Sequence, residues 1–195
     1  MKLTARQLRK NGRIGMVSPT GLALMRHFTT VFAVHDCQLP AHLRGELLLL
    51  QDLGYVITRI TRLGPIHTLT QNGYQAVGTT RYAAFTPATT ATTIYRQAAL
   101  KHLERYGMNF VQTVSLNICE VSDGHETSWA YTNGAVNVIK PYVMHLLVQK
   151  SKKTRHAGPV LVFSDSPSRY EHESIVTITL PFSQMPDYLD PVVLP

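Results

Sequence analysis

The sequence predicts an α+β protein with two domains, and three observations favour this fold class. The first is a leucine stripe at the spacing of one helix face, ended by a glycine: Leu43, Leu47, Leu50, Leu53 and Gly54. The second is a pair of β-branched segments, 56–63 and 66–69, on either side of Gly64-Pro65, which is typical of two strands joined by a tight turn. The third is a second half in which a helical segment precedes several strand-like ones. We therefore expect a helical first domain with a hairpin, then a small α/β domain with a mixed sheet.

The first domain begins with Ser18-Pro19-Thr20, which is a typical helix start. Apolar residues at 22, 25 and 28 follow at helical spacing. Thr29 or Thr30 is expected to cap a second short helix that runs through Val34. Residues 37–40 then turn the chain into the leucine-rich helix, and Thr70 is expected to cap a last short helix, Gln71 to Val77.

From Ser18 to Val77 this order of elements resembles the winged helix-turn-helix DNA-binding families. The segments Leu53 to Tyr55 and Leu69 to Gly73 contribute to the resemblance. It implies that the leucine-rich helix enters the major groove of duplex DNA and that the hairpin contacts phosphate or the minor groove. The usual winged-helix arrangement is a homodimer that reads two half-sites.

Charge divides unevenly between the two halves of the chain. Residues 1–90 hold ten Lys/Arg against three Asp/Glu, whereas residues 91–195 hold nine of each. Because cationic side chains displace counterions condensed on phosphates, this asymmetry predicts a polyanionic partner for the first half. A basic surface that serves only solubility is the alternative.

Candidate DNA-binding residues come from three places. The first fifteen residues predict a basic arm with a short helix over Thr4 to Lys10, although a solvated tail explains the same pattern. In the leucine-rich helix, residues off the apolar stripe are candidates, and Arg44 is the first choice because a guanidinium can bind guanine in a fork. In the hairpin, Arg62 lies nearer the turn than Arg59, and His67 is interpreted as a surface residue. The expected set is Lys2, Arg6, Arg9, Lys10, Arg13, His42, Arg44, Gln51, Arg59 and Arg62.

Four consecutive leucines at 47–50 make the end of that helix apolar on nearly every side. Such a helix must be covered by another domain or by a second subunit, which favours a homodimer. The expected domains are 1–78 for DNA binding, 79–90 as a linker, 91–182 as the α/β domain for dimerisation or a protein partner, and 183–195 as an extended tail that is loose or docks on a neighbour.

Within the second half, the pattern predicts a helix from about Thr90 to Tyr106. Strands are expected over 109–121, 127–131, 159–163 and 175–182. Residues 136–150 are assigned to strands on both sides of Pro141, with a helix over 142–149 as the alternative.

In outline the whole chain also resembles the replication-relaxation proteins of plasmids and mobile elements, whose second half is similar to PD-D/E-x-K nucleases. Such a nuclease needs an acid at a strand start and an acid-x-lysine on the next strand to hold Mg²⁺. The corresponding segments here are Lys140-Pro141-Tyr142 and Val148-Gln149-Lys150, and neither contains an acid. The resemblance therefore implies a second half that has lost its metal site.

We find no pattern of catalytic, cofactor-binding or metal-ligating residues. Glu120, Asp123, His125 and Glu126 surround a predicted turn and are interpreted as solvated turn residues. Cys37 and Cys119 lack metal-binding spacing and are expected to be buried thiols. Without a signal peptide or a long apolar run, the chain is expected in the cytoplasm, with no membrane partner.

The sequence thus predicts a non-enzymatic protein that binds double-stranded DNA as a homodimer. Its expected role is transcriptional regulation, or assistance to DNA replication or to a mobile element such as a plasmid. Two alternatives stay open: a nucleic-acid-processing enzyme with a nuclease-like second domain, and an adaptor that uses the winged helix to bind protein.

Overall fold

The computed structural model describes residues 17–79, 85–132, 141–153, 158–166 and 172–195. The chain divides into two compact units. Unit 1 comprises residues 1–86 and 190–195, and unit 2 comprises residues 87–189. Together they form an α+β protein with one three-stranded sheet and one mixed five-stranded sheet, as the sequence predicts at this level.

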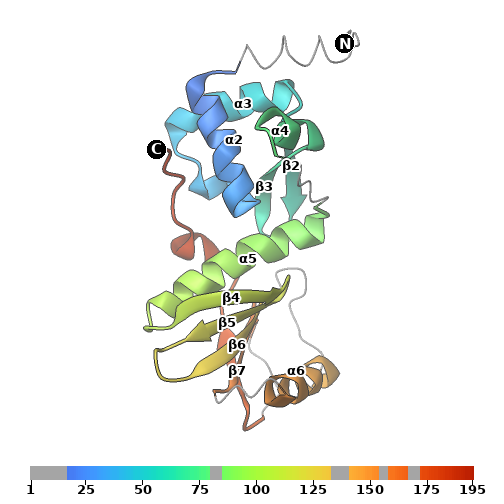
Figure 1. Ribbon diagram of the computed structural model, residues 1–195, viewed down its shortest axis with the longest axis vertical. Coiled ribbons are helices and arrows are strands. Elements are labelled where there is room, and N and C mark those ends of the chain that lie inside the picture. Colours follow the sequence, from blue (N-terminus) through green and yellow to red (C-terminus); the bar gives the residue numbers. More distant parts are fainter. Residues whose placement is uncertain (1–16, 80–84, 133–140, 154–157, 167–171) are drawn as a thin grey trace. The chain divides into compact units, whose positions relative to one another are not determined.

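Unit 1 contains three helices, a short strand and a hairpin within its described residues (Figure 1). In chain order they are α2 (Pro19–Val31), β1 (Val34–His35), the 3₁₀ turns η1 (Asp36–Gln38) and η2 (Ala41–Leu43), α3 (Arg44–Asp52), β2 (Val56–Thr61), β3 (Gly64–Leu69) and α4 (Gln71–Ala76). The strands pair antiparallel in the order β1-β3-β2. The strand before α3 is therefore paired with the returning strand of the hairpin that follows α3.

The local signals for most of these elements are correct. The Ser18 side chain accepts a hydrogen bond from the Gly21 amide at the start of α2, and the Thr70 side chain caps α4 in the same way. The leucine stripe packs inward, with Leu43, Leu47 and Leu50 buried in the core of unit 1. Gly54, which follows α3, takes the left-handed conformation that ends the helix.

The expected second short helix from Thr29 or Thr30 is wrong. α2 continues through both threonines. The Thr29 hydroxyl donates a hydrogen bond to the Arg26 carbonyl at 2.7 Å, an interaction that a helix tolerates. Phe32, with φ of 66°, ends the helix instead. Residues 34 and 35 then form β1, so the turn into α3 is made by η1, Leu39 and Pro40.

Unit 2 is a five-stranded sheet with two long helices. Its elements are α5 (Pro87–Glu104), β4 (Asn109–Ser115), β5 (Ile118–Ser122), β6 (Thr127–Thr132), α6 (Pro141–Lys153), β7 (Val160–Ser164), β8 (Ile175–Thr179) and η3 (Met185–Tyr188). The strand order is β4-β5-β6-β7-β8. The first three strands are antiparallel, and β7 and β8 run parallel to β6.

Three expectations for unit 2 need correction. The single strand expected over 109–121 is a hairpin, because Leu116-Asn117 makes a turn. The strands expected around Pro141 are wrong, and the helical alternative is correct, since proline is well placed in the first turn of α6. The first helix begins at Pro87, so the expected linker over 79–90 ends earlier.

The two long helices cover opposite faces of this sheet. Trp129 and Val162 pack with Met144 of α6. Side chains alternate along a strand, and Phe163 accordingly meets His102 of α5, with ring centroids 5.9 Å apart. No described helix is long and apolar enough to cross a membrane.

The extended tail expected over 183–195 is wrong in its first half, because Met185–Tyr188 form η3 in unit 2. The last six residues, 190–195, belong to unit 1. The Val192 amide donates to the Gln38 carbonyl at 2.7 Å, and the Gln38 side chain donates to the Asp190 carbonyl at 3.1 Å. The Val192 side chain is 4% exposed in the core of unit 1. The last six residues therefore complete a fold that begins at the other end of the chain.

We expect Val192→Ala to destabilise unit 1 by about 1–3 kcal/mol, because it removes buried methyl groups and leaves a cavity. The matched control is Val193→Ala, since Val193 is 76% exposed and its truncation should cost almost nothing. Amide hydrogen exchange of α2, α3 and β3 in the full chain measures the difference. Equal exchange rates in the two variants would show that the tail does not support unit 1.

Candidate nucleic-acid interface

The outer face of the leucine-rich helix is open. Exposed residues recur every three or four positions along η2 and α3: Ala41, Arg44, Gly45, Leu48 and Asp52. Leu47 and Leu50 lie on the buried side, whereas Leu48 is 61% exposed. The leucine run is therefore covered on one side within this chain, and Leu48 lies on the open face.

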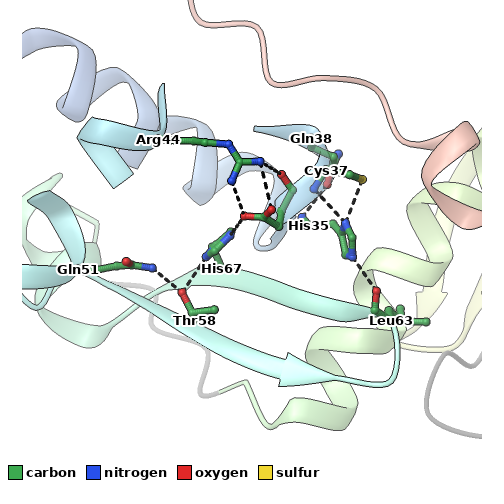
Figure 2. A network of polar contacts seen from close by, with 9 residues as sticks. His35, Cys37, Gln38, Arg44, Gln51, Thr58, Leu63 and His67 are labelled. Carbon is green, nitrogen blue, oxygen red and sulfur yellow. Dashed lines mark hydrogen bonds and ion pairs between the residues drawn. The ribbon is translucent and has the colours of Figure 1, made fainter. Parts of the chain in front are cut away.

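Arg44, the first residue of α3, forms an ion pair with Asp36 of η1 (Figure 2). Its two terminal nitrogens donate to the two carboxylate oxygens at 3.3 and 3.2 Å, and one of them also reaches the Asp36 carbonyl at 3.5 Å. The guanidinium has five N–H donors, so two remain. The Arg44 side chain is 51% exposed, which leaves this outer edge accessible to a ligand.

His67 of β3 extends this ion pair into the hairpin (Figure 2). Its Nε2 lies 3.3 Å from an Asp36 oxygen, and its Nδ1 lies 2.9 Å from the Thr58 hydroxyl on β2. Gln51, near the end of α3, donates to that same hydroxyl. The expectation that His67 is a surface residue is wrong, because its side chain is buried where the hairpin packs against α3.

Hydrogen-bond donors and acceptors along this network are mutually consistent. Burial lowers the pKa of His67 despite the opposing effect of Asp36, so the imidazole is neutral at pH 7. Partial burial would raise the pKa of Asp36, but hydrogen bonds from Arg44 and His67 outweigh it and lower the pKa. His67 then donates through Nε2 to the carboxylate and accepts through Nδ1 from Thr58, which in turn accepts from Gln51.

A second histidine, His35 of β1, forms a hydrogen bond with the hairpin turn. His35 Nδ1 accepts from the Cys37 amide at 3.2 Å, so its Nε2 carries the proton and donates to the Leu63 carbonyl at 2.7 Å. Gly64 follows with φ of 108°, and a Cβ there would lie 3.0 Å from His35 Nε2. The hairpin turn is therefore held closely against the body of unit 1.

One cysteine differs from expectation. Cys37 is exposed, with its sulfur 2.9 Å from His35 Nδ1, whereas Cys119 is buried as predicted. Desolvation of the sulfur and the charge of Asp36 raise the pKa of the Cys37 thiol, which makes it a poor nucleophile at neutral pH.

The structure brings only part of the predicted DNA-binding set together. Arg44 and Gln51 are at the two ends of the network on α3 (Figure 2). His42 is exposed in η2, two residues before Arg44. Arg59 alternates with Thr58 along β2 and so lies on the opposite face of the hairpin, while Arg62 is exposed in the turn. The arm residues lie outside the described part of the chain: Lys2, Arg6, Arg9, Lys10 and Arg13.

The positive charge of the first half is concentrated in the arm. Five of its ten basic residues lie in residues 1–16, and Arg81 lies in the segment 80–84. The described body, residues 17–79, holds four basic and three acidic residues. The arm has no acidic residue, so it carries +5 of the net +7 of residues 1–90, and the folded body is nearly neutral.

The network also contains a hydroxyl, an imidazole and a carboxylate in the order used by nucleophilic enzymes. Here the Thr58 hydroxyl is already bonded on both sides, by Gln51 and by His67. The base of such a set must receive a proton, and burial opposes protonation of His67. We interpret the network as structural, joining α3 to the hairpin.

Sequence reasoning found Arg44 and Gln51 but missed Asp36, Thr58 and the role of His67. A signal was available, because Thr58 and His67 are polar residues at positions that a tight hairpin pairs directly. Among the described residues, no group of three or more His, Cys, Asp and Glu side chains could hold a metal ion.

Comparison of the chain with protein-family models, with curated proteins and with solved structures finds no match. Function is therefore inferred from the residues and their arrangement.

We expect unit 1 to lose stability as pH falls from about 7 to 5, and His67→Gln to reduce that loss. The folded-state pKa of His67 lies below its unfolded value, so neutral His67 stabilises the fold above the unfolded pKa. This contribution declines as pH falls through that value toward the folded pKa. Amide exchange of β2 and β3 across this range measures the effect. His42→Gln, at an exposed position, is the control and should leave the pH dependence unchanged.

Proposed function

We propose that unit 1 is a winged helix-turn-helix module that binds double-stranded DNA. The observation that carries this proposal is the order and pairing of its elements: a helix, a short strand, a tight turn, the open-faced α3, and a hairpin whose second strand pairs with that short strand. In this assignment α3 is the recognition helix and the turn between β2 and β3 is the wing.

The α3 surface is suited to close approach by a groove. Gly45 has no neighbouring atom within 4 Å of the position that a Cβ would occupy, so the helix is open there. Leu48, one turn further along, offers an apolar contact of the kind that thymine methyl groups accept. Asp36 already occupies the forked edge of Arg44, so we assign Arg44 to a phosphate through its remaining donors rather than to guanine.

The arm adds affinity that does not depend on base sequence. Its five basic residues would contact phosphates or enter a minor groove beside the recognition helix. Because the folded body carries almost balanced charge, we expect removal of the arm's charge to weaken binding to all duplexes alike. Discrimination between sequences is assigned to α3.

We further propose that the protein acts as a homodimer in the cytoplasm, in transcriptional regulation or as an accessory factor in replication or in a mobile element. Two symmetry-related recognition helices would read two half-sites. Unit 2 is assigned to dimerisation or to a protein partner.

The enzymatic alternative has less support. The chain contains no acid-x-lysine triplet, and Val148-Gln149-Lys150 lies on helix α6 rather than on a strand. Glu120, on β5, hydrogen bonds with Gln112 of β4. The adaptor alternative would use the same α3 face for a protein and would leave the charge of the arm without a role.

Neutralising the arm should weaken duplex binding and flatten its salt dependence. We expect the variant with glutamine at Lys2, Arg6, Arg9, Lys10 and Arg13 to lower the slope of log K against log salt by up to about 0.9 for each phosphate that the arm no longer neutralises. Fluorescence anisotropy with a random-sequence duplex across a salt series measures this.

The matched control removes five charges from the second half, at Lys140, Lys150, Lys152, Lys153 and Arg155. It changes net charge equally, so general charge effects cancel. If both variants lose the same affinity for the duplex, the arm has no special role. If the unmodified protein binds no duplex, the proposed function is overturned.

Gly45→Glu tests the recognition helix without removing any interaction within the fold. The new side chain meets open space, and glycine is a poor helix former, so unit 1 should be unchanged or more stable. Repulsion by phosphates should then lower affinity about tenfold or more, whereas Gly45→Gln should bind far better. Equal binding by the two variants would place DNA elsewhere.

A further inference from the structure

β4 is an edge strand whose side chains are all exposed. The order β4-β5-β6-β7-β8 leaves its outer side without a strand partner among the described residues. All seven residues from Asn109 to Ser115 are exposed, on both faces of the sheet. Outward backbone N–H and C=O groups of such a strand form a template for another strand.

Large apolar side chains are exposed on β4 and beside it, among polar residues of the same strand. Tyr106 precedes the strand and is 73% exposed, and Leu116 follows it. Register shifts against β5 leave two valines, Val111 and Val114, without a partner on that strand, and both are exposed. We call this set the β4 edge: Tyr106, Phe110, Val111, Val114 and Leu116.

Charge, proline and bulges are among the devices that protect an edge strand, and β4 has the bulges alone. Residues 106–119 contain no charged residue and no proline, whereas Glu104 and Arg105 precede them and Glu120 follows. The charged side chains against this segment come from its neighbours: Arg96 of α5 donates to the Leu116 carbonyl, and Glu120 of β5 accepts from Gln112. Pairing of β4 with a second copy therefore places no charged residue of the strand itself against a like charge. The bulges increase local twist, so we expect few backbone pairs and a large share of side-chain packing.

Antiparallel pairing of β4 with its own copy is isologous, because each copy contributes the same strand. Such a contact closes as a dimer around a two-fold axis.

We propose that two copies of this chain pair antiparallel through the β4 edge, so that their two five-stranded sheets meet at β4. The proposal specifies the surface for the homodimer included in the proposed function. It does not require DNA binding, because the dimer forms in the absence of DNA. The opposite edge of the sheet, β8, stays at the periphery of the dimer.

Sedimentation velocity of the full chain without DNA tests this proposal. We expect a species of twice the 21.8 kDa chain mass. Val114→Lys should weaken the dimer about tenfold or more, because it places an unpaired ammonium in the interface. The matched control is Val176→Lys on β8, since the two valines are 45% and 46% exposed on opposite edges of one sheet. The control should remain dimeric.

Val111→Lys provides a second substitution at the same edge and should act as Val114→Lys does. A wild-type protein that stays monomeric at a concentration of about 100 μM would overturn the proposal. A dimer that only Val176→Lys breaks, or one that all three variants leave intact, would also overturn it. Assembly beyond two copies would overturn it too, because it indicates that β4 of one copy pairs with β8 of the next.

Duplex binding measured on the same variants separates the two proposals. A Val114→Lys monomer that still binds a single half-site leaves the DNA-binding function intact. A wild-type dimer that binds no duplex supports the β4 edge and removes the proposed function.

Discussion

The carboxylate of Asp36 connects helix α3 to the β2–β3 hairpin in unit 1. It accepts from Arg44 at the start of α3 and from His67 in the hairpin, and His67 continues through Thr58 to Gln51 near the end of α3. The helix is thus attached to the hairpin at both of its ends through one polar network. Such a network is favourable only when every member is satisfied, which fixes one arrangement of helix and hairpin.

This arrangement has a consequence for recognition. A surface that binds DNA must hold its contacts at fixed spacing, and the network sets the spacing between α3 and the hairpin before any ligand arrives. His35 adds a second restraint by bonding to the Leu63 carbonyl in the hairpin turn. Because Arg44 is already paired with Asp36, the arm is the main source of net positive charge in the first half.

Sequence reasoning predicts those parts of the fold that local chemistry determines. The caps at Ser18 and Thr70, the stop at Gly54 and the hairpin around Gly64 all follow from single residues and are found. The errors arise where tertiary context decides. Thr29 and Thr30 can cap a helix or lie within one, and the apolar segment after Pro141 has a composition suited to strand or helix until it packs on Trp129 and Val162.

The candidate site is predicted in part for the same reason. Arg44 and Gln51 stand out because they lie off a helical stripe, but the partner of Arg44 is eight residues earlier, in a turn that no periodicity marks. The burial of His67 depends on pairing with β1, a two-residue strand too short for any sequence pattern. The tail residue Val192 lies more than 100 residues from the core that it completes, so no local signal identifies it.

Hydrogen exchange of the full chain, with and without a duplex, tests the central claim most directly. If α3 and the hairpin form a preorganised DNA-binding surface, DNA should slow exchange at residues 41–52 and 60–65 and leave β6 and β7 unchanged. Protection confined to unit 2, with none along α3, would contradict the account.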